Sequence, residues 1–323
     1  MHSLNTATIE ILSKCNFDCM HCYLDNKNNK SLTLNKWFIS ISNLNKLGIT
    51  KLIITGGEPL LHPHFSEIYT YAYSYGMEVN IFTNGSLLSD KLISLFEIAP
   101  PKSISISIYG KDQEQYTKFT KVRSDIFNKV MCNIKKLQEK NINVQLGITP
   151  YKNSVDDDWI SFVNNNSINI NTYMIPNLRG KSNLSCRLTP NEMITVEQKL
   201  KQLRKVTTKP LTYSNTDYYK KCSGGISSIF VDPNGYVSMC AINRSDQLNI
   251  LTDDFESIKN GLQKENQKIK DRYFKSPCGT CKHNAGCRNC PMYSELEGNK
   301  GGRNQYLCSL LIARESVLHG FVA

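Results

Sequence analysis

Three cysteines near the start of the chain have the spacing of a compact metal-binding loop. Cys15, Cys19 and Cys22 are separated by three and then by two residues. A structural zinc site uses four closed ligands, whereas an iron–sulfur cluster held by three thiolates leaves one iron free to bind another molecule. His21 is a poor fourth ligand because it is adjacent to Cys22. The spacing therefore favours an iron–sulfur cluster, with zinc as the alternative.

A short glycine-rich turn follows the next expected strand. Gly56 and Gly57 allow the backbone to approach a ligand closely, and the backbone and the Glu58 carboxylate can receive an ammonium group. A Gly-Gly-Glu-Pro sequence also forms ordinary loops. Its position one strand after the cysteine loop makes ligand binding the stronger interpretation.

Seven further cysteines have a regular spacing in the last third of the chain. They are Cys222, Cys240, Cys278, Cys281, Cys287, Cys290 and Cys308. The four at positions 278, 281, 287 and 290 also have the spacing of a zinc site with four thiolates. On local spacing alone, zinc and iron are both possible here.

Together these motifs closely resemble those of radical S-adenosylmethionine (SAM) enzymes with a C-terminal SPASM extension. The cysteine loop resembles the CxxxCxxC signature of that family, and the glycine-rich turn resembles its GGE motif. Cys222, Gly235 and Cys240, with the later cysteines, resemble the extension. Two positions depart from the family pattern: His21 stands where an aromatic residue is usual, and two residues rather than three separate Cys287 from Cys290.

The resemblance implies SAM and three 4Fe–4S clusters as cofactors. The catalytic cluster would be held by Cys15, Cys19 and Cys22, and its free iron would bind the amino and carboxylate groups of SAM. Electron transfer from that cluster would then produce a 5′-deoxyadenosyl radical. The outer auxiliary cluster would be held by Cys278, Cys281, Cys287 and Cys308. The inner one would be held by Cys222, Cys240 and Cys290, so seven cysteines face eight ligand places.

The resemblance also implies roles for residues near the expected SAM site. Gly56, Gly57 and Glu58 would position SAM. Ser107 and Asn153 lie where relatives place polar groups that contact the ribose and the carboxylate, although both are also ordinary polar residues for strand ends.

Two cysteines lie outside these motifs. Cys186 follows the sixth expected strand in a polar loop, which is a poor place for a purely packing cysteine. It could be the eighth cluster ligand, or it could donate a hydrogen atom to a substrate radical. Cys132 has apolar neighbours in the middle of an expected helix, so we expect it in the core.

Strand-like and helix-like segments alternate through the first 206 residues. Strands are expected at 6–12, 51–55, 78–82, 103–108, 143–148 and 170–175, and helices at 37–47, 65–75, 90–98, 126–140, 157–163 and 192–206. Six such βα units predict a parallel sheet with helices outside, and polar residues gather at the carboxyl ends of its strands, where α/β folds build their sites.

The pattern leaves open whether this sheet is flat or curled. The resemblance implies a partial (β/α)6 barrel of the TIM type over residues 1–206. A small Cys-rich iron–sulfur domain would then occupy residues 207–323. That domain would begin with a hairpin, 226–232 and 236–240, joined at Pro233-Asn234-Gly235.

Composition narrows the class of protein. The 323 residues are 40% hydrophobic and include twelve cysteines, with a net charge of +11. No apolar run is long enough to span a membrane, and the N-terminus lacks the regions of a signal peptide. We therefore expect a cytoplasmic protein whose cysteines bind metal. Basic helices such as 199–205 and 264–272 are either solvated faces or attract an acidic partner.

These observations predict an enzyme that modifies a residue of a ribosomally made peptide or protein by crosslinking, oxidation or epimerisation. The resemblance implies this substrate class. One alternative is a radical SAM enzyme that acts on a small metabolite. The other is a non-catalytic zinc module for nucleic acid, although the basic helices lack interleaved aromatic residues.

The expected partners are the substrate and an electron donor of the flavodoxin or ferredoxin type. Only a few residues precede the first expected strand, which leaves no room for a leader-binding domain. We therefore expect recognition through a separate leader-binding protein, the basic surface or the substrate core.

Overall fold

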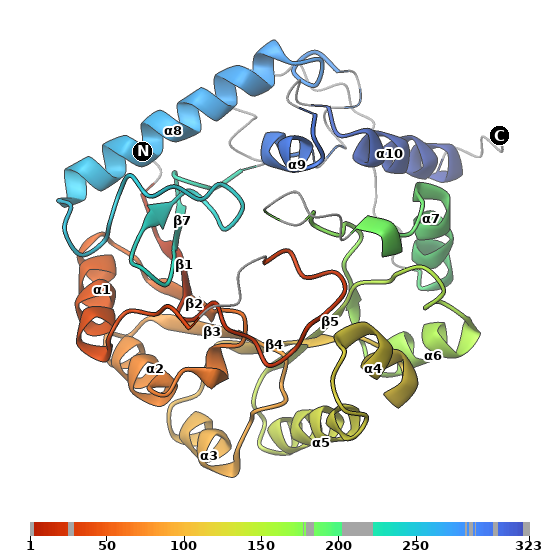
Figure 1. Cartoon of the computed structure of the whole chain (residues 1–323), viewed down its shortest axis with the longest axis horizontal. Coiled ribbons are helices and arrows are strands. Elements are labelled where there is room, and N and C mark those ends of the chain that lie inside the picture. The colour runs from red at the N-terminus through yellow and green to blue at the C-terminus, as the bar shows by residue number, and fades with distance from the viewer. Residues whose placement is uncertain are drawn as a thin grey trace. The chain divides into compact units, whose positions relative to one another are not determined.

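Alternating strands and helices build a mostly parallel sheet (Figure 1). The computed structural model describes residues 3–24, 29–176, 178, 184–201, 222–281, 283, 287, 289–299 and 303–318. The strands are β1 Thr6–Glu10, β2 Lys51–Thr55, β3 Glu78–Thr83, β4 Ser103–Ile108, β5 Val144–Ile148, β6 Asn169–Ile170, β7 Ser228–Val231 and β8 Val237–Ser238.

The helices follow the strands in the expected alternation. The α-helices are α1 Leu34–Lys46, α2 Phe65–Ser74, α3 Asp90–Ile98, α4 Gln113–Thr120, α5 Asp125–Glu139, α6 Asp157–Asn165, α7 Pro190–Lys199, α8 Phe255–Lys275, α9 Pro291–Leu296 and α10 Gln305–Leu318. Two short 3-10 helices, η1 Pro59–Leu61 and η2 Leu184–Cys186, follow β2 and precede α7.

These elements divide between two units. The first comprises Met1–Cys19, Asn26–Gly147 and Gly224–Asn266, and the second comprises Met20–Asp25, Ile148–Ser223 and Gln267–Ala323. In the first unit the strand order is β5-β4-β3-β2-β1-β7-β8. The β1–β2, β2–β3, β3–β4 and β1–β7 pairs are parallel, and only β8 runs antiparallel to its neighbour among the pairs described.

The core of the first unit lies between this sheet and its helices. Alternate strand residues, such as Ile9, Ile54 and Ile81, are almost completely buried, as period-two alternation requires. Trp37 of α1 and Tyr69 of α2 are fully buried as well. Figure 1 shows α1, α2, α3 and α5 along the outer side of the sheet. The carboxyl ends of the parallel strands therefore meet at one edge of the first unit.

The structure differs from the sequence-based expectations in several elements, and α9 and α10 were not predicted. A helix that was not predicted, α4, follows β4, and the sixth strand is limited to Asn169–Ile170 instead of 170–175. The predicted hairpin forms as β7 and β8, but β7 pairs with β1 and so extends the parallel sheet. A domain boundary at residue 206 stays a prediction, since 202–221 lie outside the described residues.

Cys132 is exposed, so its assignment to the core was wrong. It lies on α5, whose buried residues are Val130, Asn133, Ile134 and Leu137. Cys132 lies outside the buried face that these four residues form, because successive helical residues are rotated by about 100°.

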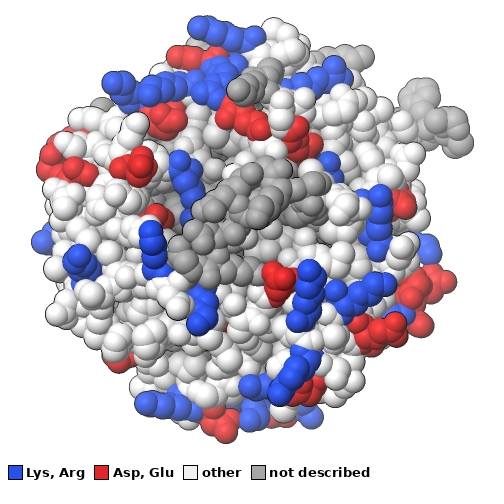
Figure 2. Space-filling view, viewed as in Figure 1, with Lys and Arg blue, Asp and Glu red and all other residues white. Residues whose placement is uncertain are grey.

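Basic residues on the helices are paired with carboxylates at several places. Lys136 contacts Asp90 at 2.7 Å, and Lys199 contacts Asp157 at 2.8 Å, both in exposed ion pairs. On the face shown in Figure 2, Lys and Arg side chains lie among Asp and Glu side chains. These pairs favour the interpretation of the basic helices as solvated faces. None of the helices in the described ranges is long and apolar enough to cross a membrane.

A buried ion pair joins α7 and α10 in the second unit. Arg314 donates two hydrogen bonds to the carboxylate of Glu197, at 2.5 and 2.9 Å. The Glu197 side chain is fully buried, and that of Arg314 is 10% exposed. A buried charge of this kind depends on its partner, because water cannot replace the lost contact.

Arg314→Met should lower the free energy of unfolding by about 3–5 kcal/mol, because it leaves the Glu197 charge buried and unpaired. Lys136→Met is the control, since its ion pair with Asp90 is exposed to solvent and should contribute far less to stability. Denaturant unfolding of both variants measures the difference. Equal losses in the two variants would contradict the importance of the buried pair.

Candidate functional site

The cysteine loop begins directly after β1. The backbone N–H of Phe17 points to the Cys15 Sγ at 3.4 Å, and the Asp18 N–H donates to the Thr120 carbonyl at 3.0 Å. The Phe17 ring is buried and meets Tyr109 edge to face. Cys15 and Cys19 remain partly exposed. The buried ring thus anchors a loop whose thiols stay accessible to a ligand.

Cys22 is also partly exposed and lies three residues after Cys19, in the Met20–Asp25 segment of the second unit. Burial lowers the pKa of the neighbouring His21 to about 4, so its ring is neutral at physiological pH.

The Gly56–Glu58 turn packs on the cysteine loop itself. A Cβ atom on Gly56 would lie 2.4 Å from the Leu12 carbonyl oxygen, and one on Gly57 would lie 2.4 Å from that of Ser13. The Gly57 N–H donates to the Leu12 carbonyl at 2.8 Å, and the Glu58 N–H donates to that of Lys14 at 3.0 Å. Neither position has room for a side chain, because the neighbouring backbone lies too close. The sequence did not reveal this reason for the two glycines.

The carboxylate of Glu58 is completely buried and accepts three hydrogen bonds. Its donors are the Thr83 hydroxyl at 2.7 Å and the backbone N–H groups of Asn84 at 2.7 Å and Leu60 at 3.0 Å. Burial raises the pKa of Glu58 to about 7, although the three hydrogen bonds act in the opposite direction. Glu58 thereby fixes the loop after β3 to the loop after β2. A direct contact between its carboxylate and a ligand stays a prediction.

Side chains of the loop after β3 extend this network to the cysteine loop. The Asn84 amide donates to the Asn16 side-chain oxygen at 2.9 Å, and the Asn16 amide donates to the Ser86 hydroxyl at 2.9 Å. Ser86 in turn donates to the Asn84 side-chain oxygen at 2.7 Å. Thr83 ends β3 and Asn84 follows it, and no sequence motif gave either residue a role. One connected network therefore joins three loops at the carboxyl ends of β1, β2 and β3.

Ser107 and Asn153 have local roles of their own. Ser107 lies on β4, and its hydroxyl is hydrogen-bonded to Tyr109. Asn153 is exposed and has a φ of +63°, a left-handed conformation that Asn adopts more readily than most residues. Their contacts with SAM stay predictions.

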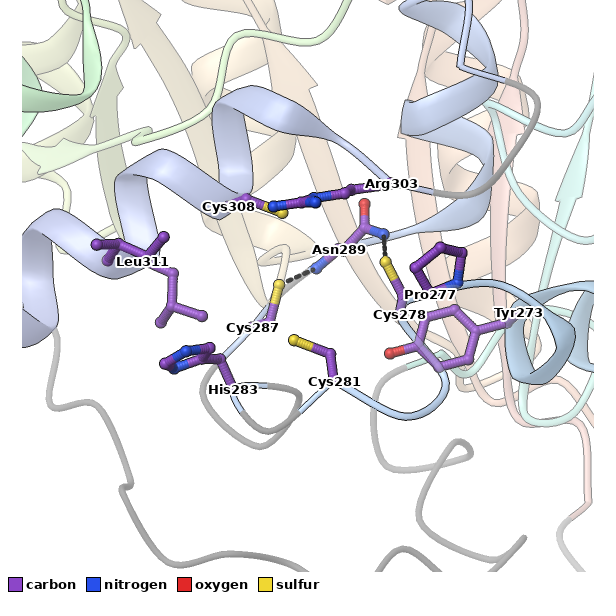
Figure 3. A pocket seen from close by; sticks show the side chains of 11 residues that line it. Tyr273, Pro277, Cys278, Cys281, His283, Cys287, Asn289, Arg303, Cys308 and Leu311 are labelled. Carbon is purple, nitrogen blue, oxygen red and sulfur yellow. Dashed lines mark hydrogen bonds between the residues drawn. The ribbon is translucent and has the colours of Figure 1, made fainter.

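Four thiols line one cavity in the second unit. Cys278, Cys281, Cys287 and Cys308 surround a space of about 200 Å³ (Figure 3). The Asn289 side-chain amide donates to the Cys278 Sγ at 3.2 Å, and the Asn289 N–H donates to the Cys287 Sγ at 3.3 Å. Arg303 is hydrogen-bonded to Cys308. Burial raises the pKa of the Cys278 thiol, and the hydrogen bond from Asn289 acts in the opposite direction. The four cysteines are those that the resemblance assigns to the outer cluster.

The cysteines that line the cavity favour an iron–sulfur cluster over the zinc alternative. Cys290, which a zinc site would need in place of Cys308, is not among the described residues that line the cavity; it precedes α9 as its N-cap residue. Within the described ranges, no three Cys, His, Asp or Glu side chains are close enough together to hold a single metal ion. A space of this size shared by four thiols fits a cluster better than one ion with sulfur ligands at about 2.3 Å.

The remaining predicted ligands are spread over both units. Cys240 follows β8 in the first unit, and its Sγ accepts a hydrogen bond from the Asn243 N–H at 3.4 Å. Cys222 and Cys290 belong to the second unit, and both are partly exposed. Their ligation of an inner cluster stays a prediction.

Cys186 is buried at the end of η2. Its Sγ lies 3.8 Å from the Met174 Sδ, and its carbonyl accepts from the Lys152 N–H at 2.8 Å. Burial raises the pKa of its thiol, which favours the protonated form. This environment suits a hydrogen-atom donor better than a metal ligand, and both roles stay predictions.

The N-terminal half of the chain, which contains the cysteine loop, matches a known protein family. The model described as the radical SAM superfamily matches residues 9–164, from β1 to α6. That range contains the cysteine loop, the Gly56–Glu58 turn and the network between them. Residues 9–164 therefore form a radical SAM domain.

Individual radical SAM proteins resemble different parts of the chain. The S-adenosylmethionine-dependent nucleotide dehydratase of Selenomonas ruminantium is 38% identical over 102 residues, which are 31% of this chain. The sporulation killing factor maturation protein SkfB of Bacillus subtilis is 29% identical over 154 residues, or 47% of this chain. The chain spans only 37% of the length of each of these two relatives.

The radical SAM fold itself extends over most of the chain. Streptococcus suis SuiB, in its structure with the precursor peptide SuiA, has a TM-score of 0.72 to this chain at 14% identity. The likeness covers 95% of this chain and 76% of that protein. The expected α/β fold is thus confirmed.

The raised pKa of Glu58 predicts a stability that depends on pH. Since the folded chain binds this proton more tightly than the unfolded chain, the free energy of unfolding should fall as the pH rises from about 4.5 to about 7. A rise in pKa of this size corresponds to about 3 kcal/mol. Glu58→Gln cannot titrate and should lose this decrease, which denaturant unfolding at pH 5, 6, 7 and 8 measures. Parallel pH curves for both proteins would show that Glu58 does not titrate in this range.

Proposed function

We propose that the chain is a SAM-cleaving enzyme that modifies a residue of a ribosomally made peptide or protein. Cys15, Cys19 and Cys22 would hold the catalytic 4Fe–4S cluster. When reduced, such a cluster supplies the electron that divides SAM into methionine and a 5′-deoxyadenosyl radical, which takes a hydrogen atom from the substrate. The observation that carries the proposal is the packing of the cysteine loop on the Gly56–Glu58 turn.

The protein's own part in this chemistry is to hold three loops in fixed positions. The glycine pair sets the backbone of residues 12–14, and Glu58 ties the loop after β3 to this turn. Asn84 and Ser86 then hold Asn16, the residue after Cys15. Loops fixed in this way lose little entropy on binding, so they would hold SAM in one orientation. Ser107 and Asn153 are proposed to contact SAM from neighbouring strands.

The C-terminal cysteines are proposed to hold two auxiliary clusters. Cys278, Cys281, Cys287 and Cys308 would hold the outer one, because they share a cavity with thiolate-stabilising donors. Cys222, Cys240 and Cys290 would contribute to the inner one. These clusters and the catalytic cluster would be reduced by a cytoplasmic electron donor of the flavodoxin or ferredoxin type.

The peptide substrate is supported by two of the similar proteins. SkfB is a maturation protein for sporulation killing factor, and SuiB is known in complex with its precursor peptide. A separate leader-binding protein is proposed as a possible partner in recognition of the substrate. A radical of this kind can lead to crosslinking, oxidation or epimerisation of the substrate.

A small metabolite is the second candidate substrate, because the nucleotide dehydratase is 38% identical over 102 residues. Mass spectrometry distinguishes the two classes after incubation with SAM, a reductant and either peptides encoded near the gene or a nucleotide pool. A mass change in the nucleotides with none in the peptides would favour this alternative.

Anaerobic reconstitution should give about twelve iron atoms per chain and an absorbance band near 400 nm that dithionite bleaches, because three cubanes of four irons are expected. Changing Cys15, Cys19 and Cys22 together to Ala should leave about eight iron atoms and abolish SAM cleavage. Iron analysis and absorbance measure both. A chain that binds one or two zinc ions and no iron would refute the proposed function.

Glu58→Ala should weaken SAM binding about ten- to a hundredfold, the equivalent of losing roughly 1.5–3 kcal/mol from charge-assisted hydrogen bonds. The loss follows because Thr83 and Asn84 are released from the turn. Equilibrium binding of SAM to the reconstituted protein measures it, and the absorbance of the clusters should stay unchanged. Glu67→Ala, which removes an exposed carboxylate of α2, is the control. SAM affinity equal to that of the wild type would remove Glu58 from the site.

A further inference from the structure

Helix α4 packs directly on the cysteine loop. The Asp18 N–H donates to the carbonyl of Thr120, the last residue of this helix, at 3.0 Å. The Phe17 ring meets the Tyr116 ring of α4 edge to face, with 6.1 Å between the ring centroids. Both rings are buried, and Phe17 lies between Cys15 and Cys19 in the chain. Tyr116 therefore packs against the segment that carries these two thiols.

The hydroxyl of Tyr116 is buried and has no hydrogen-bond partner among the described residues. An unsatisfied buried donor costs stability, so native proteins usually provide it with an acceptor. Two other buried tyrosines of the same unit differ in this respect. The Tyr69 hydroxyl donates to the Ala99 carbonyl at 2.5 Å, and that of Tyr109 is hydrogen-bonded to Ser107.

Three groups of the candidate site act electrostatically on the Tyr116 hydroxyl. Burial raises the pKa of Tyr116, and the charges of Cys19, Glu58 and Cys15 raise it further. Because such an effect weakens with distance, the hydroxyl lies near these three side chains. It keeps its proton there, but it forms no hydrogen bond with any of them.

The Tyr116 hydroxyl thus fits an acceptor that the protein itself does not provide. We propose that it donates a hydrogen bond to a sulfur atom of the catalytic cluster, either an inorganic sulfide or the thiolate of Cys15 or Cys19. The assignment rests on the proposed function, which places a cluster on this loop. A hydrogen bond to a cluster sulfur favours the reduced state, because that state carries one more negative charge. Tyr116 is then a positioning residue that makes the catalytic cluster easier to reduce.

The simpler explanation is that only the ring of Tyr116 matters, as a packing partner of Phe17. Tyr116→Phe distinguishes the two roles, because it keeps the ring and removes the hydroxyl. Tyr69→Phe is the matched control, since it removes a buried hydroxyl that already has a protein acceptor.

Electron paramagnetic resonance during a redox titration of the reconstituted full chain measures the potential of each cluster. The catalytic cluster gives the signal that is missing from the triple-alanine chain, in which Cys15, Cys19 and Cys22 are changed to Ala. In Tyr116→Phe, reduction of this cluster should become about tenfold less favourable, a fall of about 59 mV for one electron. In ²H₂O its reduced signal should also lose one deuterium coupling. The auxiliary signals, and every signal of Tyr69→Phe, should keep the potentials of the wild type.

Thermal unfolding tests whether the hydroxyl has an acceptor within the protein. The measurement uses the triple-alanine chain, which lacks the catalytic cluster. In this chain Tyr69→Phe should lower the melting temperature, because a hydrogen bond to Ala99 is lost. Tyr116→Phe should not lower it, because no hydrogen bond is lost.

The outcomes separate this inference from the proposed function. A wild-type spectrum with no signal that depends on Cys15, Cys19 and Cys22 would contradict the proposed function itself. A catalytic-cluster signal that keeps its potential in Tyr116→Phe would overturn the role of the hydroxyl alone. Loss of the catalytic cluster from that variant, an equal shift in Tyr69→Phe, or a lower melting temperature of Tyr116→Phe in the triple-alanine chain would overturn it as well.

Discussion

A close contact between two stretches of backbone fixes the position of the cysteine loop against the Gly56–Glu58 turn. Residues 12–14 of the cysteine loop lie so near to Gly56 and Gly57 that a Cβ atom on either glycine would come within 2.4 Å of a carbonyl oxygen. Backbone hydrogen bonds from Gly57 and Glu58 close this contact. The cysteine loop therefore takes its position from the next strand, not from its own three thiols. The burial of Glu58 and the side-chain network through Asn84 follow from the same contact.

The two cysteine regions meet different physical demands. The N-terminal loop keeps its thiols partly exposed above a buried ring, which leaves room for SAM at the free iron that the family chemistry requires. The C-terminal cavity is lined by four thiols, of which Cys278 is buried and Cys281 is exposed, and three of the four are hydrogen-bonded to Asn289 or Arg303. Thiols that receive such hydrogen bonds suit a cluster that transfers electrons.

Much of this fold could be predicted from sequence patterns, and most misses have a physical cause. The alternation of buried strands and helices is strong enough to place β1 to β5 within a few residues. The pattern missed α4 because its sequence, Gln113–Thr120, is mostly polar, and Tyr116 and Phe119 are its only buried aromatic residues. The parallel pairing of β7 with β1 depends on a contact between segments more than 200 residues apart, which no local pattern records.

Spacing located the cysteines of the candidate site but not the residues around them. The role of the glycines was expected to be contact with a ligand, whereas the structure shows that the backbone of residues 12–14 requires them. Asn16, Asn84 and Ser86 are common polar residues whose meaning depends on three loops meeting in space.

The central claim is that the cysteine loop and the Gly56–Glu58 turn form one SAM-cleaving site. The most direct test is to incubate the reconstituted protein with SAM and dithionite and to quantify 5′-deoxyadenosine and methionine by chromatography. The account predicts both products in equal amounts from the wild type and none from Cys22→Ala. SAM left intact by a fully iron-loaded wild-type protein, or cleaved equally by the variant, would contradict it.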